Sequence, residues 1–232
     1  MPPRPNPTHF LSLQLASAQL TKSLATFRAD VTGANGFGVP EDAVRPPGTL
    51  HLTLGVMSLK QEGVSQAVDL LNTLKPREIL SQLRAVPSSV PSTDNSPSRS
   101  TAGGLSISLR GLHSMTSASK TSVLYAPPTD AEGILYKLCE ELRQPFRETG
   151  LMEDDGRPLL LHATIVNTIY VRGRGGARRK ERLMLDARDL MSKYEDYVWV
   201  EDMPVCRVAV CKMGAKKVDG DEVYEVEGEI EI

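Results

Sequence analysis

The sequence has little of several residue types, and each shortage excludes a class of protein. It contains only three cysteines, Cys139, Cys206 and Cys211, which cannot all pair with one another, and this excludes a disulfide-rich secreted domain. No stretch approaches the roughly 18 consecutive apolar residues of a membrane-spanning helix, and residues 1–5 lack the apolar run of a signal peptide. We therefore expect reduced thiols, no membrane association and a cytoplasmic or nuclear location.

Neither sign of charge is in excess, because 27 Lys and Arg residues stand against 29 Asp and Glu residues and leave a net charge of −2. This balance excludes a generally basic nucleic-acid coat and an acidic disordered tail, although a local basic groove remains compatible with it. The 232 residues, 40% of them hydrophobic, suffice for a substantial buried core.

Short apolar runs of period two alternate along the chain with helical patterns. Strands are expected at residues 10–15, 49–59, 105–109, 122–126, 158–170, 198–200, 205–212 and 223–232, and helices at 20–27, 61–74, 76–83, 135–146 and 186–194. Ser17 is expected to cap the first helix, and Thr129 with Glu132 to form a capping box before the fourth. Because the elements intermix without strict β-α-β order, we expect an α+β fold with antiparallel sheets.

Residues 87–104 are rich in Ser, Pro, Thr and Gly and have no apolar period. We interpret them as a long surface loop rather than a linker, because the segments on either side are each too small to form a separate sheet system. Residues 1–232 are therefore expected to form one domain.

Two of the four histidines occur in the same local pattern. One copy is Leu50-His51-Leu52-Thr53-Leu54, and the other, about half the chain length away, is Leu161-His162-Ala163-Thr164-Ile165. Side chains alternate between the faces of a strand, so His and Thr share one face while the apolar residues take the other. Since the apolar faces belong in the core, we expect both His-Thr faces to line a common cleft, as an internal duplication would produce.

This pair of motifs fits acid–base catalysis at a phosphodiester. Imidazole titrates near neutral pH, so one histidine can act as general base and the other as general acid. Each Thr hydroxyl can donate a hydrogen bond to a non-bridging phosphate oxygen, and no metal or cofactor is required. A single His-x-Thr strand more often holds an ordinary structural histidine; the matched second copy favours catalysis. His9 and His113 have no Thr two residues on and are interpreted as structural or surface residues.

Further segments accompany the two motifs in a specific order: Phe10-Leu11-Ser12-Leu13, Val123-Leu124-Tyr125-Ala126-Pro127-Pro128, Asp186-Ala187-Arg188-Asp189-Leu190 and Cys211-Lys212-Met213. Together with the His-x-Thr pair they resemble the 2H phosphoesterase superfamily. More narrowly, they resemble the phosphoesterase domains of A-kinase anchoring protein 7 and of activating signal cointegrator 1 complex subunit 1.

The resemblance implies a bilobal LigT-like fold, with two pseudo-symmetric antiparallel sheets flanked by helices around a central cleft. It also implies metal-independent chemistry on RNA ends, 2′,5′-linked oligonucleotides or nucleoside 2′,3′-cyclic phosphates. By matching position, His51 and His162 are the acid–base pair and Thr53 and Thr164 contact the phosphate. The resemblance further suggests His162 as base and His51 as acid.

A basic cluster follows the second motif and consists of Arg172, Arg174, Arg178, Arg179, Lys180 and Arg182. It is either a flexible loop beside the cleft that attracts an RNA backbone, with Arg172 and Arg174 as substrate contacts, or a solvated loop without such a role. Tyr125 either presents its ring to a base or packs in the core.

The function expected is therefore a two-histidine phosphodiesterase that acts as a monomer on RNA or a small nucleotide. Two alternatives remain at this point. One is a non-catalytic module that binds nucleotides or RNA ends, and the other is a scaffold whose useful surface is the loop 87–104.

Overall fold

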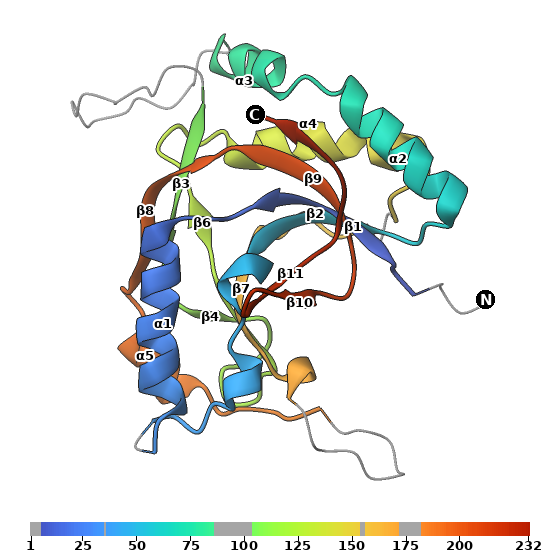
Figure 1. Ribbon diagram of the computed structural model, residues 1–232. Coiled ribbons are helices and arrows are strands. Elements are labelled where there is room, and N and C mark those ends of the chain that lie inside the picture. Colours follow the sequence, from blue (N-terminus) through green and yellow to red (C-terminus); the bar gives the residue numbers. More distant parts are fainter. Residues whose placement is uncertain (1–5, 35, 86–103, 154–155, 172–181) are drawn as a thin grey trace.

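The computed structural model describes residues 6–34, 36–85, 104–153, 156–171 and 182–232 (Figure 1). The helices are α1 (Ala18–Thr32), α2 (Gln61–Thr73), α3 (Pro76–Ala85), α4 (Leu135–Glu148) and α5 (Arg188–Lys193). The strands are β1 (His9–Gln14), β2 (His51–Met57), β3 (Leu105–Arg110), β4 (His113–Ser114), β5 (Val123–Ala126), β6 (Pro128–Thr129), β7 (Ala163–Asn167), β8 (Val198–Val205), β9 (Arg207–Lys212), β10 (Lys216–Val218), β11 (Asp221–Val223) and β12 (Val226–Glu231). The predicted loop 87–104 falls, except for Gly104, outside the described residues.

The strands form antiparallel sheets, as the α+β prediction required. Seven of them make one sheet in the order β12-β9-β1-β2-β7-β5-β4, while β6-β3-β8 form a second sheet and β10-β11 a hairpin. The large sheet has two halves, because β2 and β7 are paired through a single position, Leu52 with Ala163. The two motif strands are thus the inner strands of their halves.

The alternation of apolar and polar residues in each motif decides which face of its strand is buried. Leu50, Leu52 and Leu54 are buried in the main core, whereas His51 and Thr53 between them are only half-buried on the opposite face. That face also carries a small second apolar cluster, in which Phe10 packs with Ala209 and Cys211. The alternating apolar residues therefore leave His51 and Thr53 on the face that is turned away from the main core.

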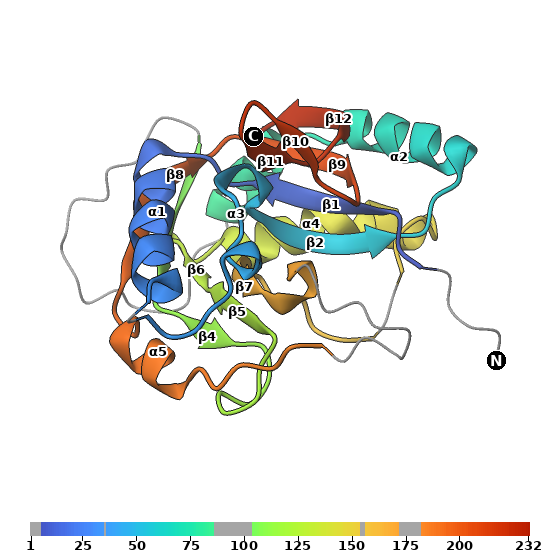
Figure 2. The same ribbon diagram turned by 60° about the horizontal axis from the view of Figure 1, so that its bottom comes forward.

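The helices cover the two ends of the molecule (Figures 1 and 2). At one end α1 packs against β8, with Phe27 of α1 against the fully buried Trp199 at a ring-centroid distance of 5.0 Å. At the other end α2 packs against β12 and β9, and α4 packs against β2 and α3. None of the described helices is long and apolar enough to cross a membrane.

Several local predictions are confirmed. The Ser17 side chain accepts a hydrogen bond from the Leu20 amide and caps α1, and Pro76 begins α3. The three cysteines are free thiols.

Two local predictions are wrong. The capping box does not form, because Thr129 pairs with β3 and Glu132 binds Arg84 at 2.6 Å; the Asp130 carboxylate instead accepts from the amide at the start of α4. The strand predicted over residues 158–170 is limited to β7, because residues 158–162 approach it as irregular chain and Thr168–Tyr170 form a 3₁₀ turn.

Candidate active site

The four residues of the predicted catalytic set lie together at the seam of the large sheet, which is the place where β2 of one half meets β7 of the other. Leu52 of β2 is paired with Ala163 of β7 in antiparallel register. One step along that register in each direction places His51 opposite Thr164 and Thr53 opposite His162. Since Leu52 and Ala163 are fully buried, these four side chains project from the other face. The structure therefore brings both motifs into one polar patch.

Both imidazoles are held in the same way by the backbone. The Nδ1 atom of His51 lies 2.8 Å from the Thr49 carbonyl oxygen, two residues earlier. The Nδ1 atom of His162 likewise lies 2.8 Å from the Leu160 carbonyl oxygen. A carbonyl only accepts, so each Nδ1 carries the proton, and in each neutral ring Nε2 has the free lone pair.

Each histidine also contacts an aromatic ring from the neighbouring strand of its own half. The Phe10 ring stacks on His51 with centroids 4.6 Å apart and an interplanar angle of 29°. Tyr125, paired with Thr164 in the register of β5 and β7, meets His162 edge-on at 5.5 Å. Each half thus places one aromatic ring against its histidine, stacked in the first half and edge-on in the second, and the half-buried Tyr125 lies at the site rather than in the core.

The two histidines differ in their surroundings. His51 is enclosed further by Tyr224, whose ring meets it at 5.4 Å and 90°. Burial among these rings lowers the pKa of His51 to about 4, against the hydrogen bond to Thr49, and the charges of His162 and Arg45 lower it further. His51 is therefore a neutral imidazole across the physiological pH range.

Some residues of the site were not found from the sequence. The motifs marked no role for Arg45, and Tyr224 was placed only within the strand expected at 223–232. In the structure Arg45 is buried near His51 and the Tyr224 ring contacts His51. The Arg45 guanidinium stacks on the Tyr170 ring at 3.8 Å from its centroid. A charged residue in the turn directly before the first motif was the available signal for Arg45; nothing local marked Tyr224.

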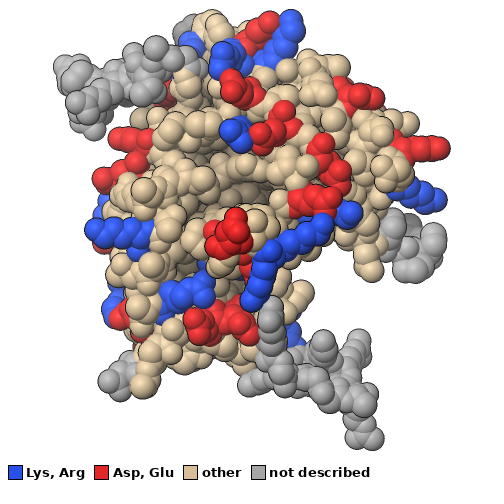
Figure 3. Space-filling view, viewed as in Figure 1, with Lys and Arg blue, Asp and Glu red and all other residues tan. Residues whose placement is uncertain are grey.

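The basic cluster lies mostly outside the described residues. This applies to the predicted substrate contacts Arg172 and Arg174, and to Arg178, Arg179 and Lys180. Arg182 is described, and its Nη1 atom lies 3.5 Å from the Ser122 hydroxyl. Both signs of charge are intermixed over the face shown in Figure 3.

Metal-ligating and thiol side chains are the other groups that could carry catalysis. Within the described ranges, no three or more His, Cys, Asp or Glu side chains are grouped so that they could hold a metal ion. Burial raises the pKa of the Cys139 and Cys211 thiols, which makes both poor nucleophiles. His9 is buried and His113 is exposed, and neither lies on the motif strands.

Comparison with known proteins identifies the family. The model of the AKAP7 2'5' RNA ligase-like domain matches residues 7–232. The chain belongs to this family. It is accordingly a member of the 2H phosphoesterase superfamily, as the paired His-x-Thr motifs predicted.

Two relatives are similar over most of this chain. The Schizosaccharomyces pombe protein named "Uncharacterized protein C15D4.13c" is 28% identical over 223 residues, which cover 93% of this chain and 91% of that protein. Activating signal cointegrator 1 complex subunit 1 of Mus musculus is 24% identical over 208 residues, which cover 82% of this chain and 54% of the mouse protein. The match thus spans about half the length of the mouse protein.

Solved structures agree on the fold. The protein TT0787 of Thermus thermophilus aligns with a TM-score of 0.53 and 16% identity, covering 97% of both chains. E. coli LigT, in a complex with 3'-AMP, aligns with a TM-score of 0.52 and 16% identity, covering 97% of this chain and 98% of LigT. The α+β, LigT-like fold predicted from the sequence is therefore confirmed.

Proposed function

We propose that the protein is a metal-independent phosphodiesterase that acts on RNA ends, 2′,5′-linked oligonucleotides or nucleoside 2′,3′-cyclic phosphates. The observation that carries the proposal is the convergence of two imidazoles with the same Nδ1 anchoring, His51 to Thr49 and His162 to Leu160. Each lies across the seam from a Thr of the other motif. One patch therefore supplies two proton-transfer groups and two hydroxyl donors.

We assign the base role to His51. An imidazole whose pKa lies at about 4 is neutral at neutral pH, and its Nε2 lone pair can accept the proton of the attacking hydroxyl. His162 enters the step as the imidazolium, with Nδ1 bonded to the Leu160 carbonyl oxygen, and donates its Nε2 proton to the leaving oxygen; His51 holds the proton taken from the attacking hydroxyl. This division is the reverse of the one that the family resemblance suggested, and it follows from the enclosure of His51 by Phe10 and Tyr224.

Thr53 and Thr164 complete the mechanism by charge stabilisation. Their hydroxyls lie on the same face as the imidazoles and can donate to the two non-bridging oxygens, where negative charge builds up in the transition state. Thr53→Val keeps the shape of the side chain and removes the donor. We expect it to lower kcat by about a hundredfold, the usual loss for one such donor.

The first experiment measures turnover of adenosine 2′,3′-cyclic phosphate and of 2′,5′-linked oligoadenylate with a chelator present throughout. His51→Ala and His162→Ala should each lower kcat by about a hundredfold or more, as loss of a general acid or base does. Arg188→Ala, at an exposed residue of α5 paired with Asp186, is the control. Turnover near that of the wild type in either variant would end the two-histidine mechanism.

A second experiment separates base from acid. A 4-nitrophenyl ester of uridine 3′-phosphate has a leaving group that departs without protonation. We expect His162→Ala to recover most of its activity on this ester, whereas His51→Ala stays impaired, because the attacking hydroxyl still needs a base. The opposite pattern would reassign the two roles while leaving the mechanism in place.

The same assays address the non-catalytic alternative. A binding module would hold adenosine monophosphates with an affinity that depends on Thr53 and Thr164, and would yield no product after long incubation of the wild type.

A further inference from the structure

Arg45 is a buried charge whose hydrogen-bonding capacity is not used up within the protein. Its residue is 3% exposed, and its Nη2 atom has no hydrogen-bond partner within the part of the chain that is described. Its backbone amide donates to the Ile165 carbonyl at 2.8 Å, which fixes it beside the second motif strand. A buried guanidinium with an unpaired nitrogen is costly, so the position points to an external acceptor.

Aromatic rings hold this guanidinium close to the histidines. Arg45 stacks on Tyr170, and the Tyr224 ring that meets His51 is also close to Arg45. Burial and the neighbouring Tyr170 raise the pKa of the Tyr224 phenol to about 12, and the charge of Arg45 opposes this. Arg45 therefore lies one aromatic ring away from the proposed base.

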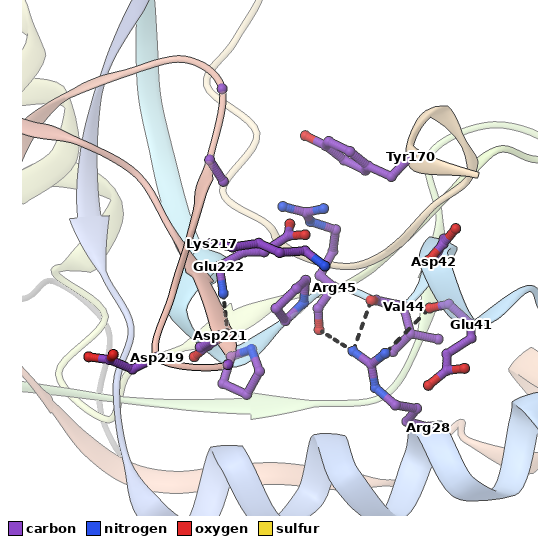
Figure 4. Close-up of a pocket in the computed structure, with 15 residues that line it drawn as sticks. Arg28, Glu41, Asp42, Val44, Arg45, Tyr170, Lys217, Asp219, Asp221 and Glu222 are labelled. Carbon is purple, nitrogen blue, oxygen red and sulfur yellow. Dashed lines mark hydrogen bonds between the residues drawn. The ribbon is translucent and has the colours of Figure 1, made fainter. Parts of the chain in front are cut away.

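Arg45 faces a cavity that adjoins the histidine patch but is separate from it. The cavity has a volume of about 830 Å³ and is lined by Arg45, Tyr170, the turn at Pro46 and Pro47, and the β10–β11 hairpin, but by neither motif histidine (Figure 4). A group bound there would be different from the phosphate at His51 and His162. Because the Tyr224 ring neighbours both His51 and Arg45, one ligand can reach the cavity and the histidine patch together.

Most other charges in the cavity are engaged or directed elsewhere. Arg28 donates to the carbonyl of Val44 at 3.0 Å, and Asp221 accepts from the Gly48 amide at 2.9 Å. Lys217 is a further cation of the lining, and it is paired with Glu222 in the backbone register of the hairpin.

Figure 4 shows the carboxylates of Asp42 and Asp219 directed away from Arg45. With Glu41, Asp221 and Glu222 they give the lining more acidic than basic residues. This balance disfavours a run of phosphates, so we expect a single anionic group at Arg45.

We propose that Arg45 binds a second phosphate of the substrate, adjacent to the one at the histidines. The inference rests on the proposed function and narrows its substrate class to oligonucleotides and nucleotides that carry a further phosphate. A guanidinium is suited to this role because it presents hydrogen-bond donors in a fixed plane that matches phosphate oxygens.

The test compares 2′,5′-linked ApA with pApA and ApAp, which add one phosphate on either side of the scissile bond. In the wild type, one of the added phosphates should raise kcat/KM by about ten- to hundredfold, the range of a charge-assisted hydrogen bond. Arg45→Met should bring this ratio close to one. Arg188→Met removes the same charge from an exposed residue paired with Asp186 and should keep the wild-type ratio.

The proposal is overturned if the wild type shows no preference for either added phosphate, if Arg45→Met keeps the preference, or if it lowers turnover of all three substrates equally. Should Arg45→Met fail to fold, Arg45→Lys takes its place, because it keeps the charge without the planar donor group. A smaller gain in kcat/KM from the added phosphate than in the wild type then supports the proposal, and an unchanged gain overturns it.

A binding measurement separates this inference from the proposed function. Calorimetric titration compares adenosine 3′,5′-bisphosphate with 3′-AMP and needs no turnover. Tighter binding of the bisphosphate by the wild type, lost in Arg45→Met, supports Arg45 even if no substrate is cleaved; equal binding of both compounds overturns it. If the wild type cleaves no substrate but still binds the bisphosphate more tightly, the result contradicts the proposed phosphodiesterase activity and leaves the inference about Arg45 standing.

Discussion

Replacing His51 by asparagine should make the folded protein less sensitive to acid. The amide nitrogen of Asn can occupy the place of Nδ1 and keep the bond to the Thr49 carbonyl, so the substitution removes the titrating ring with little change in anchoring. In the wild type the unfolded chain takes up a proton at His51 near pH 6.5, whereas the folded protein does so only near pH 4. Stability is therefore lost as the pH falls through this interval.

The magnitude follows from the two pKa values. A folded pKa of about 4 against an ordinary value near 6.5 corresponds to a total loss of about 3 kcal/mol in the free energy of unfolding, at about 1.4 kcal/mol for each pKa unit. This total is reached only when the pH has fallen below both pKa values. Between pH 7 and pH 5 the loss is about 2 kcal/mol. His51→Asn should therefore lose about 2 kcal/mol less than the wild type over that interval.

Trp199 makes the measurement direct, because it is the only tryptophan and is fully buried, so its fluorescence reports global unfolding. Urea titrations at pH 7, 6 and 5 give the free energy of unfolding of both proteins, and His113→Asn controls for the loss of one imidazole. Equal losses in wild type and His51→Asn would refute both the lowered pKa and the assignment of His51 as base.

Three further predictions concern stability at neutral pH. A methyl group at Gly55 would overlap the Met152 sulfur, so Gly55→Ala should cost about 1–3 kcal/mol in a urea titration; adding Met152→Ala should reduce that cost, and additivity of the two changes would contradict the overlap. Ser17→Ala removes the cap of α1 and should lower the free energy of unfolding by about 1 kcal/mol, whereas Ser17→Asp should restore it. Tyr194→Phe removes the 2.7 Å hydrogen bond to Asp30 and should cost about 1 kcal/mol; an unchanged unfolding midpoint would show that water replaces it.

The histidine patch was predictable because its determinants are local. Alternation alone places Leu52 in the core and His51 on the opposite face, and the repeated motif indicates that a second such strand exists. The Ser17 cap was equally local. Sequence could place these residues on faces without knowledge of which strands pair.

Other parts depend on contacts between distant segments. Asp130 caps α4 because Thr129 is drawn into a strand beside β3, which local spacing does not reveal. Tyr224 reaches His51 only because the chain after β9 returns as a hairpin against the turn at Gly48, where a Cβ would lie 2.7 Å from the Glu222 carbonyl oxygen. The enclosure that sets the pKa of His51 is therefore a property of the tertiary structure.

The strands β2 and β7 are paired at a single position, Leu52 with Ala163. Ala163 therefore lies at the point where the two strands that carry the histidines meet. Alanine has the smallest side chain that still fills a core position, and it lets the two strands approach closely at the very point where their histidines flank the join. We expect Ala163→Val to overpack the core beneath this pair and so to disturb the placement of the two strands, while His51 and His162 themselves are unchanged. The packing of Leu52 and Ala163 on the buried face therefore bears on how the two histidines are placed on the other face.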